Sequence, residues 1–445
     1  MARFRFLPIL FAVTLCAQAS YAQDGPVLQL SLRRAVEIAT SPEGSARLQL
    51  ATELTRQAEA RSTQARAALL PSFDATVSEQ NLNRSLAAFG FTGSLVPGLA
   101  IPSVIGPFNV FDARVSGTQS VLDFSSLRRY QSSKSAVLAA RSDRDNTGDQ
   151  IGAQVAKAYL EALRGRADAD TAQANADLAQ ALLEQAERLK AAGTGTGIDV
   201  TRARVQLANE RQRLVFSNNQ RRRSRLELLK AMNMRLDSNV VLTDQLVYMP
   251  VSPETLAEVK NKALEKRADY KAQLDRQTSA RLASNATGME RFPSVAAFGD
   301  YGSIGTGINS ALPTRTYGIQ VRVPIFDGWR REGRRAESES QLRSEGIRAN
   351  DLRDQIDLET RLAIDALQSA EEEVKVAAEG LDLAQNELEQ ARRRAEAGVA
   401  ISLEVTDAQT RLARARDNQT QALFHHAQAR IDLGQATGTL RSFLQ

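Results

Sequence analysis

Two hydrophobic periods alternate along the chain, one typical of helices and one typical of strands. Over long stretches apolar residues recur every three to four positions, as Leu32, Val36 and Ala39 do, and this spacing gathers them on one face of a helix. It predicts helices at about 31–70 (broken near Pro42), 125–190, 199–235 and 253–291, a long stretch ending near 396, and 402–436. The 125–190 helix alone would be on the order of 100 Å long at the usual rise per residue.

Between these helices the period changes to two. In the clearest case Tyr317, Ile319 and Val321 alternate with the smaller or polar residues Gly318 and Gln320, the pattern of a strand with two different faces. Four such strands are predicted, at about 71–82, 108–124, 293–303 and 315–327. Each is close to the length that a tilted strand needs to cross a bilayer.

The order of elements occurs twice. The stretch Asp177–Arg211 matches Asp382–Arg416 without a gap, including Ala192-Gly193 with Ala397-Gly398 and Val200-Thr201 with Val405-Thr406. Each copy is a helix, a glycine-containing break and a returning helix, so the chain is interpreted as an internal two-fold repeat. The predicted organisation is a signal peptide (1–22), repeat 1 (23–235), a linker or equatorial segment (236–252), repeat 2 (253–440) and a C-terminal tail (441–445).

The N-terminus has the pattern of a secretory signal. Arg3 and Arg5 precede the apolar core Leu7 to Leu15, and Ser20-Tyr21-Ala22 forms a small-residue site for cleavage after Ala22. We do not expect lipidation of Cys16, because the bulky Leu15 precedes it. The net charge of +5 on the full chain is small for its length, so no nucleic-acid partner is implied. We expect an exported protein.

Aromatic residues gather around the predicted strands. Of the 19 aromatic residues beyond residue 22, 12 lie within 71–124 and 292–329, including the single tryptophan, Trp329, and aromatic girdles at membrane interfaces produce such a bias. The alternative is a soluble sandwich with an apolar core. Four strands cannot close a barrel, and open edges are not tolerated in lipid. Two chains would give eight strands around a filled interior, and three would give twelve around a lumen.

Residues that could perform catalysis are sparse. The segment Gly193-x-Gly-x-Gly197 lacks the preceding strand and following lysine of a phosphate loop. His425 and His426 are adjacent, so on a helix they diverge and cannot share a metal as an i,i+4 pair would. His426 instead belongs to a small-residue heptad seam that packs against a neighbouring helix. We expect no enzyme, cofactor or metal site.

Acidic residues at the second break are the exception. Glu404 and Asp407 are spaced i,i+3 one turn after Gly398, and Asp199 and Arg202 hold the equivalent places in the first copy. Negative charge in the first turn of a helix also stabilises the helix macrodipole. That explanation accounts for one acid in each helix and less well for the second.

These features together resemble the TolC-like outer-membrane efflux proteins over essentially the whole mature length. The most specific motifs are Ile325-Phe326-Asp327-Gly328 and Ala397-Gly398-x5-Glu404-Val405-x-Asp407-Ala408, with Gly438-Thr439-Leu440 near the end. The resemblance implies a mixed α/β membrane protein. Its homotrimer would form a twelve-stranded β-barrel, four strands per chain, continuous with a long periplasmic α-helical barrel.

The resemblance also implies a gate. Acidic residues at the positions of Glu404 and Asp407 ring the constriction in this family, and Asp199 matches an acid of the other hairpin. A tyrosine and an arginine that hold the aperture of TolC itself closed are replaced by Ala395 and Ala400. Arg202 is therefore our candidate for a substitute cation.

The implied function is the outer-membrane exit duct of a tripartite efflux or type I secretion system. It would conduct substrates passively, with a periplasmic adaptor (membrane fusion) protein and an inner-membrane transporter of RND or ABC type as partners, in contact with outer-membrane lipid. Drugs, metal ions and secreted proteins all remain open as cargo. The alternative is a periplasmic coiled-coil scaffold or adaptor without a pore.

Overall fold

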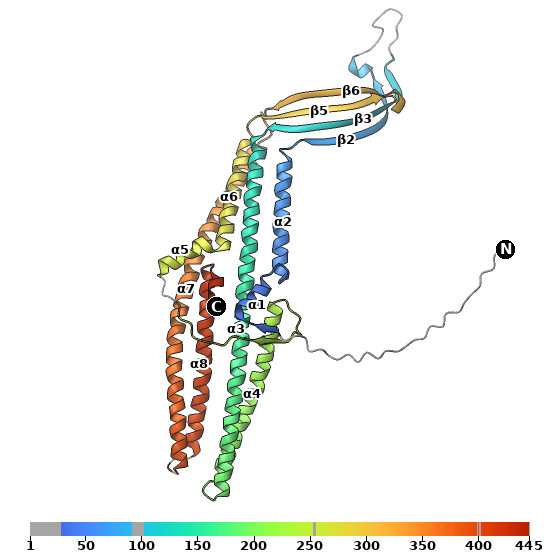
Figure 1. Cartoon of the computed structure of the whole chain (residues 1–445). Coiled ribbons are helices and arrows are strands. Elements are labelled where there is room, and N and C mark those ends of the chain that lie inside the picture. Colours follow the sequence, from blue (N-terminus) through green and yellow to red (C-terminus); the bar gives the residue numbers. More distant parts are fainter. Residues whose placement is uncertain (1–27, 91–101, 252–254, 398, 400–401, 445) are drawn as a thin grey trace, which may run out of the picture.

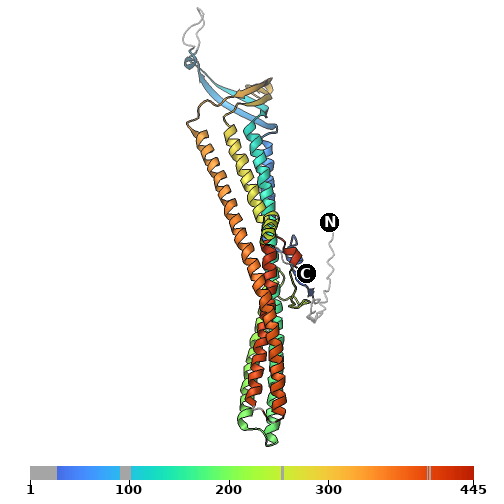
Figure 2. The ribbon, with the colours of Figure 1, turned by 90° about the vertical axis from the view of Figure 1, so that its left-hand side faces the viewer.

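A computed structural model of the chain describes residues 28–90, 102–251, 255–397, 399 and 402–444. The predicted signal peptide, Cys16, Gly398 and Ala400 lie outside the described residues. The chain is strongly elongated: a four-stranded sheet lies at one end, and the turns of two long helical hairpins lie at the other (Figures 1 and 2). Among the described residues, no helix combines the length and apolar character needed to cross a bilayer.

The first half of the chain follows the predicted order. Its elements are β1 (Leu28–Leu30), α1 (Leu32–Ala39), α2 (Ala46–Ala67), β2 (Ser72–Ser85), η1 (Ala87–Phe89), β3 (Val104–Leu122), α3 (Phe124–Ala191) and α4 (Gly197–Ala231). Helix α3 is 68 residues long. It begins directly after β3 because Asp123 accepts hydrogen bonds from the backbone N–H groups of Ser125 and Ser126, at 2.9 and 3.2 Å. Residues 123 and 124, predicted as the end of the strand, therefore belong to the helix start.

The second half repeats this order, including two helices before its first long strand, and adds η3 at its end. Its elements are β4 (Val240–Leu242), α5 (Leu256–Lys266), α6 (Ala268–Met289), β5 (Ser294–Gly305), η2 (Ile308–Ser310), β6 (Leu312–Arg322), α7 (Arg330–Glu396), α8 (Ser402–Ala436) and η3 (Leu440–Phe443). The predicted single helix 253–291 is wrong, because the backbone of Arg267 is extended (φ −64°, ψ 124°) and separates α5 from α6. The Arg267 guanidinium bonds to Asp269 and to Glu359 on α7.

The four long strands form one antiparallel sheet in the order β2-β3-β5-β6. The central pairing, β3 with β5, joins the two halves of the chain, for example Val115 opposite Tyr301. Strand β6 ends at Arg322 rather than at the predicted 327. Pro324, two residues further on, cannot donate a ladder hydrogen bond. Within the described part of the chain, β2 and β6 each pair with a single neighbour, so both outer edges of the sheet are open.

Each long helix packs against a returning helix. The heptad seam of α8 is buried at most of its positions, among them Val405, Ala408 and Leu412, which contact Leu388 and Ala391 on α7. The matching seam of α4 buries Val200 and Leu207 against Ala179 and Leu183 on α3. The predicted coiled-coil faces are confirmed, and their many alanines let the helices approach closely.

The main hydrophobic core lies near the middle of the long axis of the molecule (Figure 1). Here α1, α3, α4 and α8 meet a small parallel sheet in which Leu28–Leu30 of β1 pairs with Val240–Leu242 of β4. The fully buried Tyr159 donates a hydrogen bond to the carbonyl of Leu30 (2.8 Å), and Arg166 donates one to the carbonyl of Leu242 (2.7 Å). Within the described residues of the predicted linker, only Val240–Leu242 form regular structure, and this strand fixes the segment against the core. The predicted C-terminal tail is also packed, since Leu444 is buried in this core.

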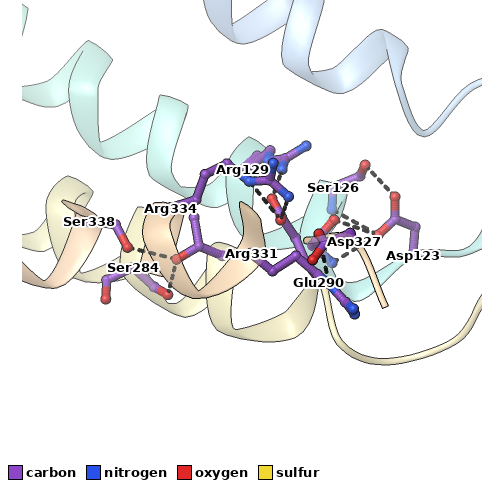
Figure 3. Close-up of polar contacts among 11 residues, drawn as sticks. Asp123, Ser126, Arg129, Ser284, Glu290, Asp327, Arg331, Arg334 and Ser338 are labelled. Carbon is purple, nitrogen blue, oxygen red and sulfur yellow. Dashed lines mark hydrogen bonds and ion pairs between the residues drawn. The ribbon is translucent and has the colours of Figure 1, made fainter. Parts of the chain in front are cut away.

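The junction between the sheet and the helices is held by ion pairs. Glu290 at the end of α6 bonds to Arg129 on α3 and to Arg334 on α7, the latter at 2.5 Å (Figure 3). The junction of β6 with α7 contains Gly328 and Trp329, both with positive φ (69° and 64°). For a tryptophan this conformation is uncommon and costs on the order of 1–2 kcal/mol.

Candidate functional site: the hairpin tips

The first tip joins α3 to α4 and is a tight, self-capped turn. Gly193 is left-handed (φ 77°) and the N–H of Gly195 donates to the carbonyl of Leu189 at 3.0 Å. Asp199 accepts hydrogen bonds from the backbone N–H (3.2 Å) and the hydroxyl (2.5 Å) of Thr196. This reciprocal cap satisfies donors at the start of α4. The carboxylate of Asp199 thus has a structural role in the first tip.

Arg202, our candidate for a substitute cation, lies beside this cap. Its guanidinium is 3.9 Å from the Asp199 carboxylate, in the same helix, and the side chain is exposed. An exposed pair at that distance is weak. At the first tip the charges of these two residues offset each other.

The second tip joins α7 to α8 and is more acidic. Val405 and Ala408 are buried in the seam with α7. Glu404 and Asp407 flank these two apolar positions on the surface of α8, with Glu404 half-buried and Asp407 exposed. The i,i+3 spacing does place two carboxylates within the first turns of one helix. Ala395 packs against the seam and carries no group that could close an aperture.

The sequence reasoning missed one residue of this tip. Arg394, near the end of α7, has its Nε 3.4 Å from the Glu404 carboxylate. A helical hairpin brings residues on either side of its turn together, so Arg394 was a candidate by position alone. Its counterpart in the first copy is the apolar Leu189. A comparison of the two copies therefore gave no reason to select Arg394. Among the described residues of this tip, Glu404 is the acid that forms an ion pair.

Polar contacts also join the two hairpins along their length. Arg416 on α8 donates to the side-chain oxygen of Asn175 on α3 (2.9 Å), and Lys157 on α3 lies 2.6 Å from Asp432 on α8. Between these contacts is a cavity of about 750 Å³ whose walls include Asp168, Glu210 and Asp417. The hairpins of one chain are therefore joined by polar contacts as well as by apolar ones, since Leu178 and Leu182 on α3 pack against the α7–α8 seam and Phe424 on α8 lies in the main core.

Buried charge in this seam shifts its acids. Burial raises the pKa of Asp168, against the lowering effect of Arg164, and the nearby carboxylates of Asp417 and Glu161 raise it further. Burial also raises the pKa of Asp417, against the lowering effect of Arg213. Two carboxylates from opposite hairpins thus line the same cavity, and the charge of Asp417 disfavours the ionised form of Asp168.

The two histidines have separate environments, as their adjacency predicted. His425 lies 3.0 Å from Glu373 at the surface, whereas His426 is fully buried and its ring contacts that of Tyr248 at 4.8 Å between centroids. Burial and the charge of Arg430 lower the pKa of His426, although Glu371 opposes them. Among the residues that the structure describes, no cluster of side chains suited to a metal ion is present.

The family model described as "Outer membrane efflux protein" matches residues 43–234 and 259–439. These two stretches cover most of the chain and both hairpins. The chain belongs to the outer membrane efflux protein family. It is accordingly an outer-membrane protein that extends into the periplasm, and membership of this family supports a role as an exit duct for efflux rather than as an enzyme.

Solved structures show the same fold at low sequence identity. The Campylobacter jejuni CmeC outer membrane channel is 14% identical with a TM-score of 0.75, and the match covers 99% of this chain and 94% of that one. The open state of the Neisseria gonorrhoeae MtrE outer membrane channel is 16% identical with a TM-score of 0.77, covering 99% and 98%. The Vibrio cholerae outer membrane protein VceC is 18% identical, with a TM-score of 0.75 and coverage of 92% and 96%. A comparison with curated proteins finds no match.

Proposed function

We propose that this efflux-family protein is the passive, gated exit duct of a tripartite efflux or type I secretion system. It acts as a homotrimer, and it receives substrate from a periplasmic adaptor protein and an inner-membrane transporter of RND or ABC type. The observation that carries the proposal is that the two ends of the molecule differ. A four-stranded sheet with open edges lies at one end, and the hairpin tip that carries Glu404 and Asp407 lies at the other (Figure 1).

The open sheet edges support the trimer. Unpaired N–H and C=O groups are not stable in lipid, so β2 of one chain must pair with β6 of another. Closure with three chains gives twelve strands, enough for a water-filled lumen, whereas two chains give eight strands whose interior side chains fill. The match of the family model to two similar stretches supports the internal repeat, in which each copy contributes one hairpin and two strands.

The acidic tip supports a gate at the periplasmic end. Three chains bring together six carboxylates from Glu404 and Asp407, and a ring of carboxylates attracts cations and repels anions at a narrow point. Asp199 and Arg202 line the alternate tips with compensating charge. Opening requires the hairpins to realign, and the partner proteins supply the energy.

Single-channel recording tests this proposal. The purified chain in planar bilayers should conduct with cation selectivity, and Glu404→Gln combined with Asp407→Asn should lower the cation-to-anion permeability ratio and relieve block by divalent cations. A matched control is Glu379→Gln, which removes an exposed carboxylate from α7 about 25 Å up the helix from the tip. Unchanged selectivity in the double variant would refute the gate.

The duct itself has a separate test. A heat-modifiable trimer in the outer-membrane fraction is the expected state of the protein. A monomer or dimer in the soluble periplasmic fraction, without conductance, would instead establish the scaffold alternative.

A further inference from the structure

The two faces of the four-stranded sheet differ in chemistry. Residues that are directly opposed on neighbouring strands lie on the same face. The register therefore gathers apolar side chains on one face, all at least half exposed: Phe73, Val115, Tyr301 and Tyr317. The opposite face carries a charged group in three successive rows of residues: Asp74, Asp112, Arg114 and Asp300. We call these four residues the charged cluster.

Arg114 lies at the centre of the charged cluster and is held by two of its acids. Its Nε donates to the Asp112 carboxylate at 2.8 Å, and its Nη1 donates at 3.0 Å to that of Asp300 on the neighbouring strand β5. All three side chains are less than a third exposed. Asp74 shares a row with Asp300 and is exposed. The guanidinium thus has a defined position and offsets part of the negative charge on this face.

The residue opposite Arg114 is a glycine, and the ion pair depends on it. Gly302 of β5 pairs with Arg114 in the register, and a Cβ atom at position 302 would lie 2.4 Å from the Cβ of Arg114. Because Gly302 has no side chain, the arginine has room to reach along β5 to Asp300. Strands β3 and β5 belong to different halves of the chain, so the charged cluster forms only when the two halves pair.

The proposed trimer gives the charged cluster a position in the duct. An apolar sheet face is turned to lipid and a polar one to the lumen, so the charged cluster lines the lumen. Same-face residues along a strand are about 7 Å apart, and three rows therefore span about 14 Å. Each copy contributes three carboxylates and one arginine, so the wall is negative at this level. Helix α3, 68 residues long, separates it from the hairpin tips by roughly 100 Å.

We propose that Arg114 is a selectivity-determining residue of the duct. The three aspartates of the charged cluster attract cations and repel anions as they pass along the lumen, and Arg114 limits this effect because it offsets one charge in each copy. The barrel is then a second source of cation selectivity, separate from the acidic hairpin tip. This inference rests on the proposed function, since the sheet face borders a lumen only in a closed assembly.

Reversal potentials of the full-length protein in planar bilayers test the role of Arg114. The background is Glu404→Gln with Asp407→Asn, in which the tip no longer masks a contribution from the barrel. There Arg114→Gln should raise the cation-to-anion permeability ratio about twofold in about 0.01 M salt, where charges act over about 30 Å. The effect should fade towards about 1 M salt, where the screening length is about 3 Å. Asp300→Asn should lower the ratio.

Two matched variants separate charge from structure. Arg114→Lys keeps the positive charge but loses the forked geometry of the guanidinium, so the ratio should stay near that of the background. Arg315→Gln removes the same charge from the opposite face of the sheet, where Arg315 pairs with Tyr301, and should also leave the ratio unchanged. If Arg114 only stabilised the sheet, Arg114→Gln and Arg114→Lys would both lower the temperature at which the trimer dissociates, and neither would change the ratio.

The possible outcomes distinguish this inference from the proposed function. A natural chain that neither assembles as a trimer nor conducts would overturn the duct, and the role of Arg114 with it. A conducting trimer in which Arg114→Gln leaves the ratio unchanged or lowers it in dilute salt would overturn the role of Arg114 alone. Asp74→Asn tests the same wall without disturbing the ion pairs of Arg114, so it decides the question if Arg114→Gln does not assemble. It should lower the ratio in dilute salt, and an unchanged ratio would show that this face does not set selectivity.

Discussion

The guanidinium of Arg394 on α7 lies 3.4 Å from the carboxylate of Glu404 on α8, across the turn that joins the two helices. Asp407, one turn further along α8, is exposed. The two acids of the tip are thus electrostatically unequal. In a gate built from three copies, Asp407 would carry more of the effective negative charge than Glu404.

The first prediction concerns that pair. Arg394→Gln should raise the cation-to-anion permeability ratio by about fivefold or less, because an exposed ion pair is worth about 1 kcal/mol or less. Reversal potentials in a salt gradient measure the ratio. Arg393→Gln is the matched control, since it removes the same charge from the neighbouring exposed position. In a Glu404→Gln background, Arg394→Gln should have no larger effect than this control, and a full effect there would show that the pair does not set selectivity.

The second prediction concerns the seam between the hairpins. Burial raises the pKa of Asp168, so the folded state binds a proton more readily than the unfolded state does. The stability contributed by protonated Asp168 is therefore present at low pH and is lost as the pH rises through the raised pKa. Asp168→Asn should stabilise the protein at neutral pH, by less than about 1 kcal/mol because the side chain is partly exposed and solvent screens it.

Thermal unfolding followed by circular dichroism at several pH values measures this effect. The difference in unfolding temperature between Asp168→Asn and the natural chain should shrink as the pH falls. Asp170→Asn, an exposed aspartate two residues away on the same helix, should show no such pattern. A gap that grows on acidification would contradict the assigned direction.

The third prediction concerns the buried histidine. Neither ring nitrogen of His426 has a hydrogen-bond partner among the described residues, and burial lowers its pKa. The neutral ring contributes its full stabilisation at pH values above the pKa of His426 in the unfolded chain. This contribution is lost as the pH falls towards the lowered pKa of His426 in the folded protein. His426→Leu keeps a similar volume and removes an unsatisfied polar group, so it should cost little at pH above about 7.

The measured quantity is the fall in unfolding temperature on acidification. His426→Leu should reduce that fall, whereas His425→Gln should leave it close to that of the natural chain, because His425 is at the surface beside Glu373. The two histidines are neighbours in sequence, which makes the pair a closely matched comparison. Equal responses from both variants would assign the acid sensitivity elsewhere.

The fourth prediction concerns the break between α5 and α6. The Arg267 side chain is only 11% exposed and bonds to both Asp269 and Glu359. Burial by itself raises the pKa of Asp269, but the hydrogen bond and charge of Arg267 lower it below its ordinary value. Arg267→Met should therefore destabilise the protein by about 2 kcal/mol or more, because it leaves two partly buried carboxylates without their partner.

Chemical denaturation of the periplasmic helices measures this loss. Arg235→Met is the control, since Arg235 forms a similar bidentate pair with Asp237 at 85% and 67% exposure. Exposed pairs of that kind contribute about 0–1 kcal/mol. A loss of similar size in the two variants would mean that the Arg267 cluster does not hold the helix break.

The sequence by itself determined the elements whose causes are local. The period of apolar residues located the long helices and the four strands, and the match between Asp177–Arg211 and Asp382–Arg416 located both hairpins. The acidic spacing of Glu404 and Asp407 was also readable in advance, since i and i+3 positions are neighbours on any helix.

Tertiary structure decided what depends on residues far apart in sequence. Arg267 breaks a helix without a proline or glycine because Glu359, on another helix, holds its guanidinium. The pairing of β1 with β4 joins segments more than 200 residues apart, and three-residue strands are too short to show a period. Arg394 meets Glu404, and Asp168 meets Asp417, only once the helices are packed. The period of apolar residues indicates which face of a helix or strand is buried. Which residues contact that face depends on how the helices and strands pack in the folded protein.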